Sequence, residues 1–293
     1  MPFWVHIAIF IFLICKLKTL INKPNFKNKV VLVTGGSSGI GESLALEFVK
    51  LGAKVIISGR NLKELNRVKN SAGSLQSQIE ILELDLSFAD DAYKKACNFI
   101  ADRKIDILVN NAGIGQRCGF LENLDNLNIE RSLMEVNYFS PVALTKAVYK
   151  SMNPGGQIVI ISSMGGVIGS PYRTAYSGSK FAVAKFFETL SAEGSQCDIS
   201  IIYPSYVKSN FSKNALDSKG ESFGKDVENT KNGMAADVFA RKAVEGIYKR
   251  ETYIFVCEFK QKVIYFLKYW IPSLSDWILY KYGLKVKREM ESA

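Results

Sequence analysis

Apolar runs with the length of a buried β-strand alternate with stretches of helical periodicity from residue 28 onward. This alternation is the feature that most constrains the fold. Strands that are apolar on both faces and are separated by helices specify a parallel sheet covered on both sides. The sequence therefore predicts an α/β fold with a single, doubly wound parallel sheet. The expected strands are Lys29–Thr34, Lys54–Gly59, Ile79–Asp85, Ile105–Asn111, Gln157–Ser163, Asp198–Pro204 and Thr252–Val256.

A glycine-rich turn, TGGSSGIG, lies between the first expected strand and the first expected helix. Gly35 permits a tight turn, Gly39 lets the backbone approach a phosphate, and Gly41 lets the helix pack closely on the strand. The amide groups at the start of the helix then hold a pyrophosphate. In this position the turn predicts dinucleotide binding and a Rossmann-type sheet. The expected cofactor contacts here are Gly35, Ser37, Ser38, Gly39, Ile40 and Gly41.

The end of the second strand indicates which dinucleotide binds. An NAD site places an acidic residue there to hold the ribose hydroxyls. Here the strand ends in SGR, and Arg60 with Ser37 can bind a 2′-phosphate. NADP(H) is therefore the expected cofactor, and a merely solvated Arg60 is the alternative.

Cysteine and histidine usage excludes several classes of site. The five cysteines are scattered and form no C-x-x-C pair, which argues against a disulfide framework and a zinc site. The single histidine, His6, lies in the apolar N-terminus, so neither a histidine-dependent triad nor a metal site is expected. The net charge of +10 suggests an anionic partner, but no motif of a nucleic-acid reader is present.

The positive charge falls instead beside two apolar ends. The first, FWVHIAIFIFLIC, is followed by lysines and is somewhat shorter than the roughly 20 residues of a membrane span. Because the charge follows the apolar run, residues 1–22 are expected to be an uncleaved anchor rather than a signal peptide, with a buried core helix as the alternative. Residues 259–288 mix aromatic and basic side chains around Pro272, which predicts two helices on a membrane surface. A dimer contact or a cover for the core is the alternative there, and residues 28–257 form the expected single domain.

Tyr176 and Lys180 are the candidate catalytic pair. On a helix these residues are neighbours, and the SGS between them leaves the phenol accessible. An ammonium about 4 Å away contributes about 4 kcal/mol at an effective dielectric near 20, which lowers the pKa of a phenol toward neutrality. Tyr176 is therefore expected to act as a general acid or base. Ser163 ends the fifth strand, whereas Ser162 points to the other side and is read as structural.

Several motifs in the same order and spacing resemble the short-chain dehydrogenase/reductase superfamily over roughly residues 28–256. They are TGGSSGIG, NNAG, Asn137 in VNYFSPVALTK, Ser163 before Tyr176, YSGSK and the YP that closes the sixth strand. Within the superfamily, EVNYFSPVALTK and the tail around WIPSL are similar to the membrane-bound dehydrogenase/reductase member 7 and 7B group.

The resemblance implies a role for each matching residue. Tyr176 is the general acid that protonates a carbonyl oxygen, Ser163 stabilises the developing oxyanion, Lys180 also holds the nicotinamide ribose, and Asn137 anchors a proton-relaying water. Asp85, Leu86, Asn111, Val207 and Ser209 match positions that line the cofactor. Two departures are Gly178, where the family has alanine, and Ser205, where glycine is usual after the proline.

The ends and the resemblance together imply a lipophilic substrate collected from a membrane, at the endoplasmic reticulum or peroxisome, by a domain facing the cytosol. The substrate implied is a keto-lipid such as acyl- or alkyl-dihydroxyacetone phosphate, or a steroid or retinoid. A 3-ketosphinganine or ketosteroid reductase, and a non-catalytic cofactor-binding scaffold, are the alternatives. The resemblance also implies a homo-oligomer. The sequon at Asn210 is expected to be unmodified, and the polar segment after Ser205 is expected to be a lid or disordered.

Two arginines flank the expected cleft. Arg117 follows the fourth strand and Arg173 precedes Tyr176, so both are expected near the cleft mouth. We hypothesise that they meet a substrate phosphate; the alternative is that they are solvated at the surface.

Overall fold

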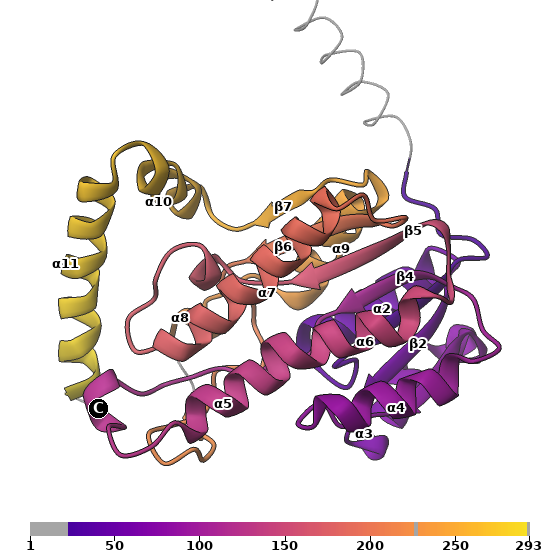
Figure 1. Ribbon diagram of the computed structural model, residues 1–293, viewed down its shortest axis with the longest axis horizontal. Helices are drawn as coiled ribbons and strands as arrows, with labels where there is room; N and C mark the ends of the chain where they lie inside the picture. Colours follow the sequence, from indigo (N-terminus) through magenta and orange to yellow (C-terminus); the bar gives the residue numbers. More distant parts are fainter. Residues whose placement is uncertain (1–22, 226–227, 292–293) are drawn as a thin grey trace, which may run out of the picture.

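A seven-stranded parallel sheet forms the centre of the computed structural model, which describes residues 23–225 and 228–291 (Figure 1). The strand order is β3-β2-β1-β4-β5-β6-β7, so the chain winds outward from β1 in one direction and from β4 in the other. The prediction of a single, doubly wound parallel sheet is confirmed. The strands are β1 Val30–Thr34, β2 Lys54–Gly59, β3 Ile79–Glu83, β4 Ile105–Asn110, β5 Met152–Ile161, β6 Asp198–Pro204 and β7 Tyr253–Val256.

The register of the central strands places their side chains against helices on both faces. Leu32 of β1 pairs with Ile56 of β2 and with Leu108 of β4. Every residue of β4 is buried, which is why the strand reads as an unbroken apolar run. The carboxyl ends of β1 and β4 diverge toward different connections, and such a point is where α/β sheets bind ligands.

Helices cover the two faces in separate sets. α2, α3 and α9 pack on one face through Phe48, Leu65 and Phe239, whereas α4, α6 and α7 pack on the other through Leu144 and Phe187. The bounds are α2 Gly39–Lys50, α3 Leu62–Ser71, η1 Gly73–Gln78, α4 Ala89–Ile100, η2 Phe120–Glu122, α5 Asn128–Met134, η3 Glu135–Phe139, α6 Ser140–Tyr149, η4 Met164–Gly166, α7 Thr174–Ala192, α8 Glu228–Lys231 and α9 Ala236–Tyr248.

Two helices follow the sheet, α10 (Phe259–Trp270) and α11 (Pro272–Glu291). They meet at Pro272, where the sequence predicted a break. Figure 1 shows α11 standing along the end of the domain at which α5 lies. Ile264 and Tyr265 of α10 and Leu279 of α11 pack against the core on the α7 side of the sheet. The tail therefore covers part of the domain, which was the alternative to its lying only on a membrane.

The expected anchor, residues 1–22, lies outside the described residues. Within the described ranges, no helix combines the length and the apolar character that crossing a membrane requires. Most of the polar segment after β6 is described, and it is held by backbone pairing. Leu216 pairs with both Gln116 and Ser222, and Val207 pairs with Met234.

Candidate active site

A cleft of about 1330 Å³ opens at the carboxyl ends of the strands. It is bounded by the glycine-rich turn, the ends of β2 to β6, the start of α7, the loop after β6, and the inner sides of α10 and α11. All the candidate residues of the sequence analysis except Asn137 and Arg117 line it. Asn137 lies just behind the wall, buried to 1% exposure.

The turn before α2 has the geometry of a phosphate cradle. Gly35 and Gly39 have φ of 64° and 59°, a region that L side chains rarely adopt. A Cβ on Gly41 would lie 2.2 Å from the Gly35 carbonyl oxygen, so only glycine fits there. Ser38 caps α2 without a side-chain hydrogen bond to the helix. The first amide groups of α2 therefore keep their donors for an anion, and the residues present fit a dinucleotide pyrophosphate.

Asn111 supports this turn from the neighbouring strand. Its side-chain amide donates to the Thr34 carbonyl at 2.7 Å, and its backbone N–H donates to the Thr34 hydroxyl at 2.9 Å. From the opposite side, Ser209 of the loop after β6 approaches Gly39 so closely that a Cβ there would meet the Ser209 Cβ at 3.1 Å. Asn111 thus supports the shape of the turn, Ser209 packs against the turn, and Val207, nearby in the chain, lines the cleft.

Arg60 stands at the end of β2, where the sequence placed the 2′-phosphate. Its side chain is 67% exposed, and Asp85 lies 3.9 Å from its Nε. Leu86, beside Asp85, is fixed because its carbonyl accepts the Ser140 hydroxyl at 2.7 Å. Ser37 is close to this group, since its hydroxyl would lie 3.6 Å from a Cβ on Gly59.

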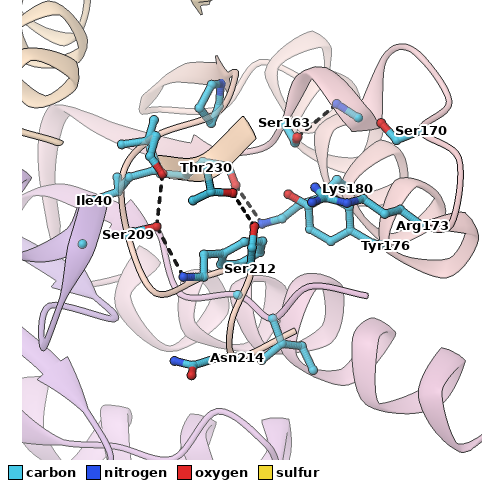
Figure 2. A pocket seen from close by; sticks show the side chains of 18 of the residues that line it. Ile40, Ser163, Ser170, Arg173, Tyr176, Lys180, Ser209, Ser212, Asn214 and Thr230 are labelled. Atoms are coloured by element: carbon cyan, nitrogen blue, oxygen red, sulfur yellow. Dashed lines mark hydrogen bonds between the residues drawn. The ribbon is translucent and has the colours of Figure 1, made fainter. Parts of the chain in front are cut away.

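Tyr176, Lys180 and Ser163 lie together at the opposite end of the cleft. Figure 2 shows Tyr176 and Lys180 on α7 with Ser163 nearby on the segment after β5. Ser163 accepts the Gly165 N–H at 3.0 Å, which fixes its hydroxyl in the cleft. Burial raises the pKa of Tyr176, while a hydrogen bond with Ser163 and the charge of Arg173 act in the opposite direction.

The expected source of Tyr176 acidification differs from the arrangement observed. Lys180 turns its ammonium to the Ile161 carbonyl, to which it donates at 2.9 Å. The contacts that lower the pKa of Tyr176 in the described chain are Ser163 and Arg173, and Lys180 is not among them. Because Lys180 is buried, its own pKa falls to about 8. The spacing of four residues brought both groups into the cleft, but it did not fix the direction of the ammonium.

Asn137 is positioned by an irregular turn of helix. The segment η3 between α5 and α6 is a π-helix, whose wider turn changes the direction of its side chains relative to an α-helix. Asn137 accepts the Ile114 N–H at 2.9 Å and donates to the Ile114 carbonyl and to the Ser179 hydroxyl, each at 3.0 Å. A Cβ on Gly113 would lie 2.9 Å from the Asn137 oxygen and 3.1 Å from the Lys180 nitrogen, so both groups approach the same face of Gly113.

Ser162 has a structural role, as its strand position predicted. Its hydroxyl donates to the Lys180 carbonyl at 3.0 Å, which ties β5 to α7. The helix surface at Gly178 is open, because a Cβ added there would meet no atom within 4 Å. The family alanine is therefore not excluded sterically by the chain itself.

Gln116 is a positioning residue that the sequence did not reveal. It is 2% exposed, and its side-chain oxygen accepts the N–H groups of Ala175 and Tyr176 at 2.9 and 3.1 Å. It thereby caps the start of α7 from a distant segment. The sequence signature of a helix cap involves the residue directly before the helix. Gln116 lies far from α7 in the sequence, so no local pattern predicted its role.

Ser205, the second departure from the family pattern, contacts the C-terminal helices. The Gln261 side-chain amide of α10 donates to its hydroxyl at 2.5 Å. Further along, Ile278, Leu279, Tyr282 and Lys285 of α11 line the same cleft. The sequence predicted these helices but gave no signal that their inner sides belong to the site.

Of the two arginines expected at the cleft mouth, Arg173 lines the cleft and Arg117 does not. Arg117 is 8% exposed, and its Nε has no hydrogen-bond partner among the described residues. Arg173 lies over the rings of Tyr176 and Tyr206, with its guanidinium carbon 5.8 Å from each ring centroid. Burial and the neighbouring Arg173 lower the pKa of Arg117 to about 10. The surface alternative is therefore wrong for Arg117.

Comparison with known proteins identifies the family. Residues 29–220 match the family model described as short chain dehydrogenase. The chain belongs to the short-chain dehydrogenase/reductase family. Within this oxidoreductase family it belongs to the member 7 and 7B group. It is 37% identical to a dehydrogenase/reductase SDR family protein 7-like of Drosophila melanogaster, over 88% of this chain and 82% of that one. It is 33% identical to dehydrogenase/reductase SDR family member 7B of Mus musculus, over 94% and 88%.

Solved structures of the family share the fold. A short-chain dehydrogenase from Sphingobium yanoikuyae in complex with NADPH has a TM-score of 0.67 and 25% identity, covering 78% of this chain and 87% of that one. A short-chain dehydrogenase/reductase from Burkholderia phymatum in complex with NAD has a TM-score of 0.73 and 21% identity, covering 85% and 96%.

Proposed function

We propose that the protein is an NADP(H)-dependent oxidoreductase that interconverts a carbonyl and an alcohol on a lipophilic substrate, with Tyr176 as the general acid or base. The observation that carries this proposal is the placement of Ser163, Tyr176 and Lys180 in one wall of a cleft that ends in a phosphate cradle. Structures of family members with bound NADPH and NAD support a nicotinamide cofactor.

The bound cofactor supplies a hydride to the carbonyl carbon or accepts one from the alcohol. Tyr176 gives its phenolic proton to the carbonyl oxygen, or takes it back in the reverse direction. Ser163 donates a hydrogen bond to the same oxygen and stabilises the charge that develops there. Lys180 contributes a positive charge to the same wall of the cleft. Because its pKa is about 8, most molecules carry a protonated Lys180 at neutral pH.

A preference for NADP(H) is supported by Arg60 and Ser37 at the end of β2. Asp85 competes for Arg60, but at 3.9 Å and with both groups largely exposed this ion pair is weak. A 2′-phosphate carries more charge and offers a forked geometry, so it displaces such a contact readily.

A lipophilic substrate and a membrane surface are supported by the two sides of the tail. The inner side lines the cleft with Ile264, Ile278 and Leu279. The outer side exposes large aromatic side chains, with Trp270 at 72% and Trp277 at 57%. Such a helix pair, with lysines between its aromatic residues, suits the headgroup layer of a bilayer. A substrate dissolved in that layer then reaches the cleft along the inner side. We place the domain on the cytosolic side, so Asn210 carries no glycan.

The test of the catalytic proposal is the Tyr176→Phe variant of the full chain in lipid vesicles, with NADPH oxidation measured against a panel of lipid ketones. We expect turnover to fall by roughly 100-fold or more, because general acid catalysis contributes that much. Binding of NADPH should remain within a few-fold of the wild type. Tyr253→Phe, on the edge strand β7 and outside the cleft, is the matched control.

This experiment also separates the enzyme from a non-catalytic scaffold. If the wild type binds NADPH but oxidises it with no ketone of the panel, the scaffold reading stands and the catalytic proposal fails. If Tyr176→Phe retains wild-type turnover, the proton donor has been assigned to the wrong residue.

The membrane proposal has its own test. The chain has three tryptophans, so a Trp4→Phe background leaves only Trp270 and Trp277. Vesicles with brominated acyl chains should quench their fluorescence, because an interfacial ring lies within reach of the chains. Unquenched fluorescence in vesicle-bound protein would contradict lipid contact by the tail.

A further inference from the structure

We propose that Arg67 of α3 is a positioning residue for the cofactor: it pairs with the carboxylate of Glu42 and neutralises a charge that would otherwise repel a pyrophosphate from the start of α2. This inference rests on the proposed oxidoreductase function and concerns how tightly its cofactor is held. Neither Arg67 nor Glu42 lines the cleft, so both act on it from outside its wall.

The first observation is the position of Glu42. It lies in the first turn of α2, directly after Gly41, and its side chain is 22% exposed. An acidic side chain near a helix N-terminus interacts favourably with the positive end of the helix dipole. A pyrophosphate bound by the glycine-rich turn needs the same helix end. An unpaired Glu42 would therefore compete with the bound anion and repel it.

The second observation is the set of contacts that Arg67 makes. Its two terminal nitrogens donate to the two carboxylate oxygens of Glu42 at 2.9 and 2.8 Å, which is a forked contact between α3 and α2. Its Nε donates to Glu64 at 2.7 Å. Hydrogen bonds with these two carboxylates raise the pKa of Arg67, and the one with Glu42 contributes most. Arg67 therefore pairs chiefly with Glu42 and neutralises the charge beside the cradle.

The third observation connects Arg67 to the glycine-rich turn itself. Its Nη2 also donates to the Ser37 carbonyl at 3.2 Å. Ser37 lines the cleft, whereas Arg67 does not. The Ser37 carbonyl, which carries a partial negative charge, is thus turned toward α3, and the N–H of Ser38 on the same trans peptide points the opposite way. Arg67 therefore holds two negative groups, one full and one partial, on the side of the turn away from the cleft.

An ordinary surface ion pair is the alternative. Arg67 is 46% exposed, and exposed pairs contribute little to stability. Arg241 of α9 offers a comparison, because it is 54% exposed and donates to Asp237 one turn earlier in the same helix. Arg67 instead joins two helices and a loop carbonyl. The role that we propose for it concerns the charge near the cradle, not the stability of the fold.

The size of the effect follows from Coulomb's law. Two unit charges of the same sign roughly 10 Å apart repel each other enough, at effective dielectrics between about 20 and 80, to weaken binding by roughly 2- to 20-fold. Repulsion between solvated groups decreases as the salt concentration rises. It acts on the pyrophosphate, which NADPH and NADH share, so both nucleotides are affected to a similar degree. Arg60, in contrast, is expected to act on the 2′-phosphate alone.

The experiment measures the dissociation constants of NADPH and NADH, at low and at high salt, for the full chain and its variants. In Arg67→Met both nucleotides should bind roughly 10-fold more weakly at low salt, and the loss should shrink at high salt. In the double variant Glu42→Gln with Arg67→Met, affinity should return to within about two-fold of the wild type, because the unpaired carboxylate is gone. Arg241→Met is the matched control and should bind both nucleotides as the wild type does.

Several outcomes would overturn the inference. A double variant that binds as weakly as Arg67→Met would show that Arg67 acts on the shape of the turn and not on the charge of Glu42. A loss that is equal at the two salt concentrations would contradict a charge effect. A loss confined to NADPH would place the effect at the 2′-phosphate.

The same measurements separate this inference from the proposed function. If Arg67→Met binds both nucleotides as tightly as the wild type, the inference fails and the proposed function stands. If the wild type binds neither nucleotide, the proposed function fails as well. The double variant also controls for folding, because it lacks the same forked contact as Arg67→Met, and its recovered affinity would show that losing this contact does not unfold the cradle.

Discussion

Gln261 of α10 donates its side-chain amide to the hydroxyl of Ser205 at 2.5 Å, and so joins the C-terminal helices to the loop that follows β6. That loop also carries Val207, which lines the cleft, and Ser209, which packs against Gly39 of the glycine-rich turn. This hydrogen bond therefore connects the loop beside the expected cofactor site to the helices beside the expected substrate site. The serine that replaces the usual family glycine is the residue that makes this bond.

Ser205→Gly is expected to weaken this connection. Loss of a partly buried side-chain hydrogen bond costs about 0.5–1.5 kcal/mol of the free energy of unfolding. Because α10 and α11 line the substrate end, KM for the substrate should rise more than KM for NADPH. Urea unfolding and steady-state kinetics measure the two effects.

Gln261→Ala and the double variant close the thermodynamic cycle for this pair. If the two residues act only through their mutual bond, the double variant is no less stable than either single one. Additive losses would show that the bond at 2.5 Å does not couple the two segments.

Arg60→Ala is expected to reduce the preference for NADPH over NADH. The guanidinium is the cation that the structure places at the end of β2 and toward the cleft. Loss of a forked contact with a phosphate weakens NADPH binding by roughly 10- to 100-fold, while NADH binding changes little. The dissociation constants of both nucleotides, measured by fluorescence, give the ratio.

Lys63→Ala is the control for the loss of one charge, because Lys63 is exposed on the neighbouring helix α3. An unchanged NADPH to NADH ratio in Arg60→Ala would contradict the assignment. In that case Arg60 is merely solvated and the selectivity for NADP(H) resides elsewhere.

Gln116→Met tests the cap on α7. The substitution keeps the volume of the side chain but removes the oxygen that accepts the N–H groups of Ala175 and Tyr176. Leaving such donors unsatisfied in a buried place costs about 1–3 kcal/mol of the free energy of unfolding. Because Tyr176 lies in the first turn of α7, kcat should fall while the affinity for NADPH is retained. Wild-type kcat in this variant would show that Gln116 does not position Tyr176.

Local patterns predicted the fold well, because each strand is a short apolar run and each break is marked by its own residues. The turn at Gly35 and Gly41 could be predicted for the same reason, because the local backbone geometry requires glycine at both positions. The sequence did not predict that α11 forms one side of the cleft. The helix reads as amphipathic, but what its inner side covers depends on segments far away in the chain.

The same limit explains the individual residues that differ from expectation. Arg117 was expected near the cleft mouth, but it is buried and does not line the cleft, because the loop after β6 pairs with its segment through Leu216. Helical spacing placed Tyr176 and Lys180 on one face, yet the direction of a flexible ammonium is chosen by the nearest acceptor, the Ile161 carbonyl.

Lys180→Met is expected to make the protein more stable and inactive. Folding lowers the pKa of Lys180 from its ordinary 10.5 to about 8, so the unfolded chain binds more protons between these pH values. Stability therefore rises with pH over this range, and below pH 8 the full cost of the buried charge is present. That cost is about 3 kcal/mol by linkage, of which the lost bond to Ile161 offsets about 1 kcal/mol in the variant.

The measurement is urea unfolding of both proteins without cofactor at pH 7 and pH 10. At pH 7 the variant should be more stable by about 1–2 kcal/mol, and at pH 10 this advantage should largely vanish because Lys180 is then neutral in the folded wild type. Every other ionisable group is common to both proteins, so its contribution cancels in the difference. An advantage that is equal at the two pH values would show that Lys180 is not held in the folded protein as an unpaired, desolvated cation.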